Sequence, residues 1–571
     1  MTIVMTPDKE PFFAATYVPR QDSYGRIGLL TLIPRISDFW TKERSSLADQ
    51  AGRVRAALQR TFHKVAPIAL DASVLHAAYN QLTQQYDEAW GGFGGAPKFP
   101  AAHNLIFLLR YYAITEDAQA LAMVEQTLSA MRRGGIYDQI GCGFHRYATD
   151  QKWQVPHFEK MLYDQAMLLL AYTQAFQVTG NIDYRDTAGE IIRYMQRDLR
   201  HDQGGFYAAE DADSEGEEGR FYTWTWQELE RILNSEEVAL AHGAWRLEQG
   251  VLQSRTPDDS PALRALRQKL LHHRDQRPRP ARDSKILTDW NGLAIAALAR
   301  AGRVFGRADC LEMAEQASRF IMQYLRRKDQ GLFHRFARGQ AAVPGFLDDY
   351  AFLVFGFLEM FAATFQGRFL LEGKRLMDRA LQDFWSQKRQ RFFHTSHSSE
   401  NLLFRSMDSY DSAMPSGTSV AYGNLAYLSH LFADPTYRRV LSGLERAMAQ
   451  EVMAQPRAYT AFLGHLAWRQ AQPREVVLAG DDSLPGCHAA LQELKRVFVP
   501  NTVLLFKDTK EDDAVLQDLL PYLANYPATN GPAIYVCRDF ACQMPVGRVD
   551  QALELLTETV SVNRKKDVIS T

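Results

Sequence analysis

Residues 134–164 read GGIYDQIGCGFHRYATDQKWQVPHFEKMLYD, a glycine-punctuated loop that runs into an amphipathic helix. Side chains that carry function are commonly displayed on such loops, which a rigid scaffold positions. Pro156 fits the first turn of the helix, whose apolar face comprises Phe158, Met161, Leu162, Ala166, Leu169 and Leu170. We expect this helix to be mostly buried. Its polar first residues should therefore lie at the mouth of a cavity or in a satisfied hydrogen-bond network.

The alternation of loop and amphipathic helix extends outward from this stretch, over about residues 71–470. The periodicity predicts about twelve helices, near 71–90, 101–113, 118–133, 157–178, 181–199, 288–304, 308–327, 347–366, 368–388, 416–433, 435–453 and 457–469. Short Gly/aromatic hairpin signals recur between them, at 91–95, 134–137, 204–207, 331–334 and 391–394. Such recurrence is typical of a repeat architecture. Six helical hairpins closed into an (α/α)6 toroid would satisfy it, whereas an open solenoid has more constant spacing.

The flanking regions have different patterns. Residues 2–17 read as a β-hairpin and 30–62 as helix, and we expect that the chain begins inside a fold whose earlier part is missing. After Pro473, strands and helices alternate as in a small α/β unit. The predicted domains are 1–65, a barrel at 71–470 with an irregular insert at 211–283, and 474–571.

Composition excludes several classes of function. The 571 residues carry a net charge of -2, which gives no general attraction to nucleic acid or acidic lipid. No stretch reaches ~18 consecutive apolar residues, so no membrane span is expected, and the N-terminus lacks the pattern of a signal peptide. Five scattered cysteines do not suggest a disulfide framework. Cys537 and Cys542 are expected to serve packing, and a reducing cytoplasm is the expected location.

Seven motifs, in order, resemble the YyaL / spermatogenesis-associated family of thioredoxin-domain-containing proteins. They are GGFGGAPKFP (91–100), GGIYDQIGCGFHRYATDQKWQVPHFEKMLYDQA (134–166), DADSEGEEGRFYTW (211–224), ILTDWNGL (286–293), LDDYAF (347–352), AMPSGTS (413–419) and YVCRDFACQMPV (535–546). The resemblance spans nearly the whole chain. It implies a thioredoxin-like domain followed by a six-hairpin barrel similar to N-acylglucosamine 2-epimerases and related glycoside-processing enzymes.

The resemblance also shows what is missing. In the family, the thioredoxin-like part opens with a cysteine-bearing motif, and only its second half matches here, at residues 2–19. No thioredoxin-type Cys-x-x-Cys motif is present, so no thiol-disulfide activity is expected. Epimerases of the barrel superfamily use a pair of histidines, one from a Pro-Gly-His-like segment. Here the corresponding segment has Phe346 after Pro344-Gly345, which makes the epimerase interpretation weaker.

Carboxylates are then the leading candidates for catalysis, because glycoside cleavage needs one acid and a second carboxylate as base or nucleophile. Asp289, Asp348, Asp349 and Asp164 each lie near the start of a predicted inner helix. Helix capping is the competing interpretation for each of them. His145 and His157 could be proton shuttles or ligands of sugar hydroxyls, or structural hydrogen-bonding groups.

Further residues are predicted to bind the substrate: Asp138, Arg146, Trp153, Glu159, Lys160, Tyr163, Trp290, Asn291, Tyr350 and Ser416. For Lys160, an ion pair with Asp164 four residues later is the simpler alternative. The acidic run from Asp211 begins like a calcium loop but has Tyr222 where the bidentate Glu is required, so no metal site is predicted. No cofactor is predicted either.

The sequence therefore predicts acid/base chemistry on a sugar or glycoside in the funnel of the toroid. The alternative is a sugar-binding or interaction module without catalysis. Residues 134–164, the turn at Asp289 and the turn at Asp348-Asp349 should meet at one mouth, because parallel inner helices all begin on the same face. The sugar, the type of reaction and the oligomeric state are left open.

Overall fold

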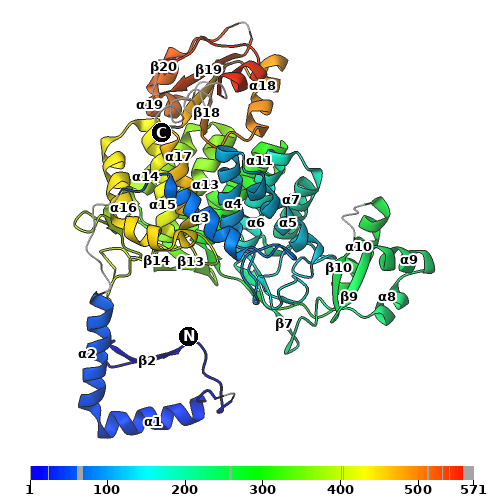
Figure 1. Cartoon of the computed structure of the whole chain (residues 1–571), viewed down its shortest axis with the longest axis vertical. Helices are drawn as coiled ribbons and strands as arrows, with labels where there is room; N and C mark the ends of the chain where they lie inside the picture. Colours follow the sequence, from blue (N-terminus) through cyan, green and yellow to red (C-terminus); the bar gives the residue numbers. More distant parts are fainter. Residues whose placement is uncertain are drawn as a thin grey trace.

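The computed structural model describes residues 2–23, 25–60, 69–255, 260–399, 402, 404–510, 513–529, 531–538 and 541–556. Within these residues, six helices form a closed inner ring (Figure 1). They are α4 (Ala102–Thr115), α6 (Leu162–Thr179), α11 (Thr288–Phe305), α13 (Leu347–Thr364), α15 (Gly417–Phe432) and α17 (Thr460–Gln470). Each contacts the next, and α17 contacts α4 again. This closure confirms the toroid and excludes an open superhelix.

An outer helix lies before or after each inner one. The outer helices are α3 (Ser73–Gln85), α5 (Ala118–Arg133), α7 (Ile182–Tyr194), α12 (Ala308–Tyr324), α14 (Gly367–Phe384) and α16 (Pro435–Ala454). The apolar pattern of each helix determines whether it belongs to the inner or the outer ring. In α6, residues 162–175 are all buried, as a helix that is apolar all round requires. In α14, the buried residues recur every three or four positions, which leaves the opposite face to solvent.

Short strands precede the inner helices at the end where these begin. One sheet has the order β11-β6-β5, from β5 (Lys160–Met161), β6 (Ala209–Glu210) and β11 (Arg282–Asp283). Another has the order β12-β13-β14, from β12 (Ile286–Leu287), β13 (Phe333–Ala337) and β14 (Gln340–Pro344). Two hairpins complete this face: β3 (Tyr147–Ala148) with β4 (Pro156–His157), and β15 (Trp385–Ser386) with β16 (Arg391–Phe392).

These strands correct one boundary. The helix expected from residue 157 begins at Leu162, because residues 156–157 and 160–161 are held in strand pairs.

The insert between α7 and α11 is ordered where the structure describes it, although the sequence suggested an irregular segment. It contains β7 (Asp213–Ser214), β8 (Glu217–Glu218), α8 (Trp226–Ile232), α9 (Ser235–Ala244), β9 (Trp245–Glu248), β10 (Val251–Ser254) and α10 (Pro261–Arg274). Leu229, Trp245, Leu252 and Leu266 belong to a small hydrophobic core of its own. A short π-helix, Met195–Leu199, follows α7.

The N-terminal region forms the predicted hairpin from β1 (Thr2–Met5) and β2 (Pro11–Ala15), followed by α1 (Leu29–Lys42) and α2 (Arg44–Arg60). The single helix expected at 30–62 is therefore two helices that divide at Glu43, and residues 61–62 lie outside the described part. The domain boundaries near residues 65–71 and 470–474 stay a prediction.

The C-terminal region covers the other end of the barrel (Figure 1). Its sheet has the order β18-β17-β19-β20, from β17 (Arg474–Gly480), β18 (Thr502–Asp508), β19 (Ala533–Arg538) and β20 (Ala541–Cys542). Strands β17 and β18 are parallel, whereas β17 and β19 are antiparallel. The helices of this region are α18 (Pro485–Arg496) and α19 (Ala514–Leu519), with a 3-10 turn at Pro521–Asn525; another 3-10 turn, Pro456–Tyr459, precedes α17 in the barrel. Residues 549–556 are also helical.

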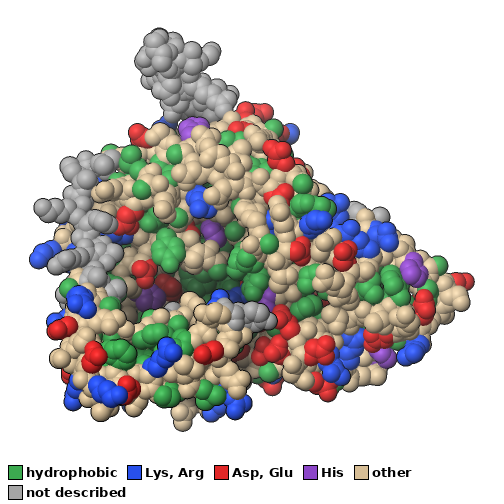
Figure 2. All heavy atoms as spheres, turned by 60° about the horizontal axis from the view of Figure 1, so that its bottom comes forward, with side chains coloured by type: hydrophobic (Ala, Val, Ile, Leu, Met, Phe, Trp, Pro, Cys, Tyr) green, Lys and Arg blue, Asp and Glu red, His purple; other side chains and the backbone are tan. Residues whose placement is uncertain are grey.

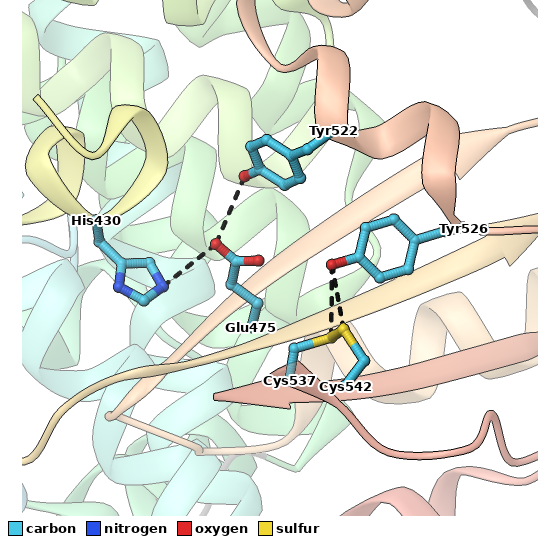
Figure 3. Close-up of a disulfide and its surroundings, with 6 residues drawn as sticks. All are labelled: His430, Glu475, Tyr522, Tyr526, Cys537 and Cys542. Atoms are coloured by element: carbon cyan, nitrogen blue, oxygen red, sulfur yellow. Dashed lines mark hydrogen bonds and ion pairs between the residues drawn. A yellow bond between two sulfur atoms is a disulfide. The ribbon is translucent and has the colours of Figure 1, made fainter. Parts of the chain in front are cut away.

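Cys537 and Cys542 form a disulfide between β19 and β20, which corrects the expectation that both serve only packing (Figure 3). The two residues are direct partners in the antiparallel register, a position that brings side chains of neighbouring strands together. The Tyr526 hydroxyl lies 3.5 Å and 3.4 Å from the two sulfur atoms. Cys142, Cys310 and Cys487 are free and buried.

Among the described residues, no helix combines the length and the apolar character that crossing a membrane requires.

Candidate functional site

The first turns of α11 and α13 are joined by a hydrogen bond. The backbone N–H of Asp289 donates to the Asp349 carboxylate at 3.1 Å. Asp289 is buried, and its own carboxylate accepts the N–H of Trp290. Burial, and next the negative charge of Asp349, raises the pKa of Asp289 well above its usual value. Both effects favour the protonated form of Asp289.

Asp349 is fully buried and caps the start of α13. Besides Asp289, it accepts the N–H of Phe346 at 2.7 Å. The Nδ1 of His334, in β13, lies 3.0 Å and 3.1 Å from its two oxygens. Burial opposes the charge of His334, but the hydrogen bond and the charge of Asp349 outweigh it and raise the pKa of the imidazole. Capping and positioning thus account for these contacts of Asp349.

Asp289, His334 and Asp349 are also the one group among the described residues whose ligand atoms lie close enough together for a metal ion, within 4.8 Å of one another. Two carboxylates and an imidazole suit a divalent transition metal. In this structure Nδ1 of His334 is engaged with Asp349.

Asp348 points elsewhere from the same helix turn. Its carboxylate lies 3.8 Å from Nδ1 of His394, and its side chain is partly exposed. Burial raises the pKa of Asp348, although nearby His394 opposes the shift. Phe346 lies between the two histidines: its ring is stacked on His394 at 5.0 Å and edge-on to His334 at 5.1 Å.

The 134–164 stretch reaches the same mouth through Tyr163. Its ring meets Trp290 edge-on at 4.9 Å, which joins the start of α6 to the start of α11. Next to it, Asp164 is buried, and one of its carboxylate oxygens has no hydrogen-bond partner. Burial raises the pKa of Asp164 well above its usual value, despite the attraction of Arg146.

Arg146, His157 and Glu159 form an ion network beside Asp164. Arg146 pairs with Glu159 at 2.8 Å, and His157 lies between Glu159 at 3.2 Å and Glu218 at 2.7 Å. The hydrogen bond to Glu159 raises the pKa of His157 despite its partial burial. These side chains are half-buried, so a polar ligand can reach them.

Figure 2 shows the face on which these loops lie, and the face is hollowed there. Acidic, basic and histidine side chains are visible inside the hollow. The contacts above place the first turns of α6, α11 and α13 side by side on this face.

Other residues predicted to bind substrate form internal bonds instead. Asp138 makes two hydrogen bonds of 2.9 Å to Arg274 of the insert and one of 2.7 Å to Lys160. Burial opposes its charge, but Arg274 and Lys160 outweigh this and hold the pKa of Asp138 well below its usual value. Lys160 also donates to the carbonyl of Cys142. The suggested ion pair of Lys160 with Asp164 is thus replaced by a buried pair with Asp138.

His145 and Trp153 are also buried away from the hollow. His145 bonds the carbonyl of Phe158 through Nδ1, and burial lowers its pKa to about 3. Such a histidine stays neutral, which does not suit the proton shuttle that was expected. The indole N–H of Trp153 donates to the carbonyl of Trp90, and its ring is fully enclosed, so it offers no face to a sugar.

Asn291, Tyr350 and Ser416 hold the loops of this face. Asn291 is fully buried. Its side-chain oxygen accepts the N–H of Phe206, and its amide nitrogen donates to the carbonyl of the same residue. The Tyr350 hydroxyl accepts the N–H of Leu332, and Ser416 caps α15. All three explain how the mouth is built, and none presents a free group to it.

His334 and His394 were not predicted, although both were inside the quoted hairpin signals. Each follows an aromatic residue at the end of a Gly/aromatic or Phe-Phe hairpin, in the segment between an outer helix and the next inner helix. The repeated aromatic-His ending of these two hairpins was the available signal.

Comparison with known proteins identifies the family. The chain is 32% identical over 610 residues to spermatogenesis-associated protein 20 of Homo sapiens, covering 96% of this chain and 78% of the human protein. The chain belongs to the spermatogenesis-associated protein 20 family. A Caenorhabditis elegans relative, named only as uncharacterized protein B0495.5, is 28% identical and covers 98% of this chain and 83% of its own. Residues 1–59 match the thioredoxin family model Thioredox_DsbH, described as "Protein of unknown function, DUF255".

Among solved structures, cellobiose 2-epimerase from Bacillus thermoamylovorans B4167 is similar with a TM-score of 0.45 and 10% identity, covering 67% of this chain and 88% of its own. D-mannose isomerase is similar with a TM-score of 0.46 and 12% identity, and the match covers 66% of this chain and 86% of the isomerase. Likenesses at this level do not assign a function to this member of the family.

Proposed function

We propose that the mouth of the toroid binds a sugar or glycoside and performs acid/base chemistry on it, with Asp289 as the acid. The observation that carries the proposal is the buried Asp289, whose pKa is raised by burial and by Asp349, beside the hydrogen-bonded Asp349–His334 pair. Neighbouring titratable groups whose environments favour opposite protonation states are the usual arrangement for acid and base roles.

The second proton-transferring group would be Asp348. It lies on the same face, raises the pKa of Asp289 further through its charge, and is more exposed than Asp349. In this scheme Asp289 donates a proton to the departing or carbonyl oxygen, and Asp348 accepts one from water or from a sugar carbon. Asp349 is fully enclosed and already bonded to Asp289, Phe346 and His334, so we assign it a positioning role.

Binding of a sugar would use the other members of the mouth. Trp290 and Tyr163 supply aromatic surface, and Arg146 and Glu159 supply polar edges for hydroxyl groups. The first turns of the inner helices carry partial positive charge, which favours hydroxyl-rich or anionic ligands. His157 would join them as a ligand, since Glu159 and Glu218 hold it in place.

A sugar-binding module without catalysis is the alternative, and one experiment separates the two. The wild-type protein is screened on a glycan array and against a panel of aryl glycosides and reducing sugars. Asp289→Asn is tested in parallel, with Asp309→Asn on outer helix α12 as a matched first-turn control. Conversion lost only in Asp289→Asn supports the enzyme, binding without conversion supports the module, and no binding of any sugar refutes the proposal.

A redox role of the thioredoxin-like part is not proposed, because residues 1–59 contain no cysteine. The cytoplasmic location stays a prediction, which the oxidation state of Cys537 and Cys542 in cell extracts would test.

A further inference from the structure

The far end of the inner ring holds a second cavity, of about 180 Å³. It lies where the inner helices end and is closed by α18 and residues 497–504 of the C-terminal region. No residue proposed for the mouth lines it. Its polar lining includes Arg110 of α4, Gln174 of α6, Arg300 and Arg303 of α11, Glu359 of α13 and Lys495 of α18.

The charges in this cavity do not balance. Glu359 is the one acidic side chain that lines it among the described residues, against four basic ones. Arg300 takes both oxygens of that carboxylate in a bidentate pair. Arg303 reaches Glu359 only at 3.8 Å, and its buried Nε has no hydrogen-bond partner. Among the described residues, Arg110 has no hydrogen-bond or ion-pair partner. Its charge is repelled by that of Arg300.

Burial lowers the pKa values of several basic side chains in this cavity. Burial, and next the charge of Arg300, lowers the pKa of Arg110 to about 10. Burial lowers the pKa of Lys495 to about 8. His465, which also lines the cavity, stays neutral, because burial and the two arginines lower its pKa well below the usual value. Buried like charges are costly unless a counter-charge joins them.

An independent observation concerns Gln174. Its side chain is only 2% exposed, and its amide nitrogen is a buried donor without a partner. Gln174 and Arg110 line both this cavity and a smaller one of about 50 Å³ that continues along the barrel axis. An unpaired buried donor costs ~1–3 kcal/mol, so its orientation toward the cavity needs an acceptor.

We propose that this closed end of the barrel is a binding site for a small anion, a carboxylate or a phosphate group, held by Arg110, Arg303 and Gln174. Guanidinium groups pair in a bidentate manner with two oxygens of either anion, and the amide supplies one more donor. Since Lys495 comes from α18, a bound anion also ties the C-terminal region to the barrel. The site is separate from the sugar chemistry proposed at the mouth.

The test measures the melting temperature of the full chain in inorganic phosphate or succinate against chloride at equal ionic strength. In the wild-type protein one of the two anions raises the melting temperature by roughly 2–4 °C at saturating concentration. A rise in melting temperature with phosphate alone identifies a phosphate site. A rise with succinate alone identifies a carboxylate site. No rise with either anion overturns the proposal.

Two variants fix the place of binding. Arg110→Met and Gln174→Leu should abolish the anion effect, whereas Arg375→Met, an exposed arginine on outer helix α14, should retain it. Arg110→Met should also melt no lower than wild type in chloride, because it removes an uncompensated buried charge. An unchanged anion effect in Arg110→Met, or unfolding of this variant, would show that the arginine serves structure and not binding.

Discussion

The N–H of Asp289 donates to the carboxylate of Asp349, 3.1 Å away and sixty residues later in the chain. One bond therefore ties together the first turns of two neighbouring inner helices. It also assigns different duties to two aspartates that look alike in the sequence. Asp349 is the hydrogen-bonded helix cap, whereas burial and the charge of Asp349 raise the pKa of Asp289.

Asp289→Asn should leave the melting temperature within a few degrees of wild type. Burial raises the pKa of this carboxyl group and so favours its uncharged form, and an Asn oxygen can still accept the N–H of Trp290. Thermal unfolding followed by circular dichroism checks this, alongside Asp309→Asn. A large drop in melting temperature for Asp289→Asn alone would mean that the carboxylate is structural.

Asp349→Asn should destabilise the protein, by about 1–3 kcal/mol. Only one oxygen would remain to accept from Phe346 and Asp289, and the charge partner of His334 would be lost. Denaturant unfolding measures the loss. If stability is unchanged, the capping role is wrong, and Asp349 returns as a candidate for direct catalysis.

Lys160→Met should destabilise strongly, by about 3–5 kcal/mol, because it breaks a buried ion pair with Asp138. The exposed Lys42→Met, at the end of α1, should change stability by no more than about 0.5 kcal/mol. Chemical denaturation of both variants tests the contrast. A stable Lys160→Met variant with impaired sugar binding would restore the predicted substrate role.

Stability should depend on the ionisation of Glu475, which lies beside Tyr522 and 3.4 Å from His430 (Figure 3). Burial raises its pKa from 4.5 to about 7. The folded state therefore binds more protons than the unfolded state between these values, so stability falls as pH rises from about 4.5 to 7. Integrated over this window, the effect is at most about 3 kcal/mol.

Glu475→Gln should remove this pH dependence and raise stability above pH 7. Urea unfolding at several pH values, with the exposed Glu236→Gln as control, measures it. An unaltered pH profile in Glu475→Gln would assign the dependence to another group.

Thiol counting tests the disulfide. Native oxidised protein should react slowly with a thiol reagent, because Cys142, Cys310 and Cys487 are buried. Denatured protein should show three thiols, and reduced denatured protein all five. Five thiols without reductant would contradict the pairing of Cys537 with Cys542.

The sequence by itself determined the fold class. The helical periodicity and the recurring Gly/aromatic hairpins are local features, set by side chains near each other in the chain, and they sufficed for the toroid. Local patterning also placed Asp164, Asp289, Asp348 and Asp349 in the first turns of inner helices. It could not separate a helix cap from an acid, because both functions use the same residue at the same position.

Only the tertiary structure decided which groups are charged and which are free. The sequence could not distinguish Asp138 from a ligand-binding acid. The structure shows that its partner is Arg274, far along the chain in the insert. His334 became relevant only because β13 brings it to Asp349. Protonation depends on burial and on charges within a few ångströms, and both are set by contacts between segments distant in the sequence. Periodicity carries no information about those contacts, so the roles of the residues within the site follow only from the tertiary structure.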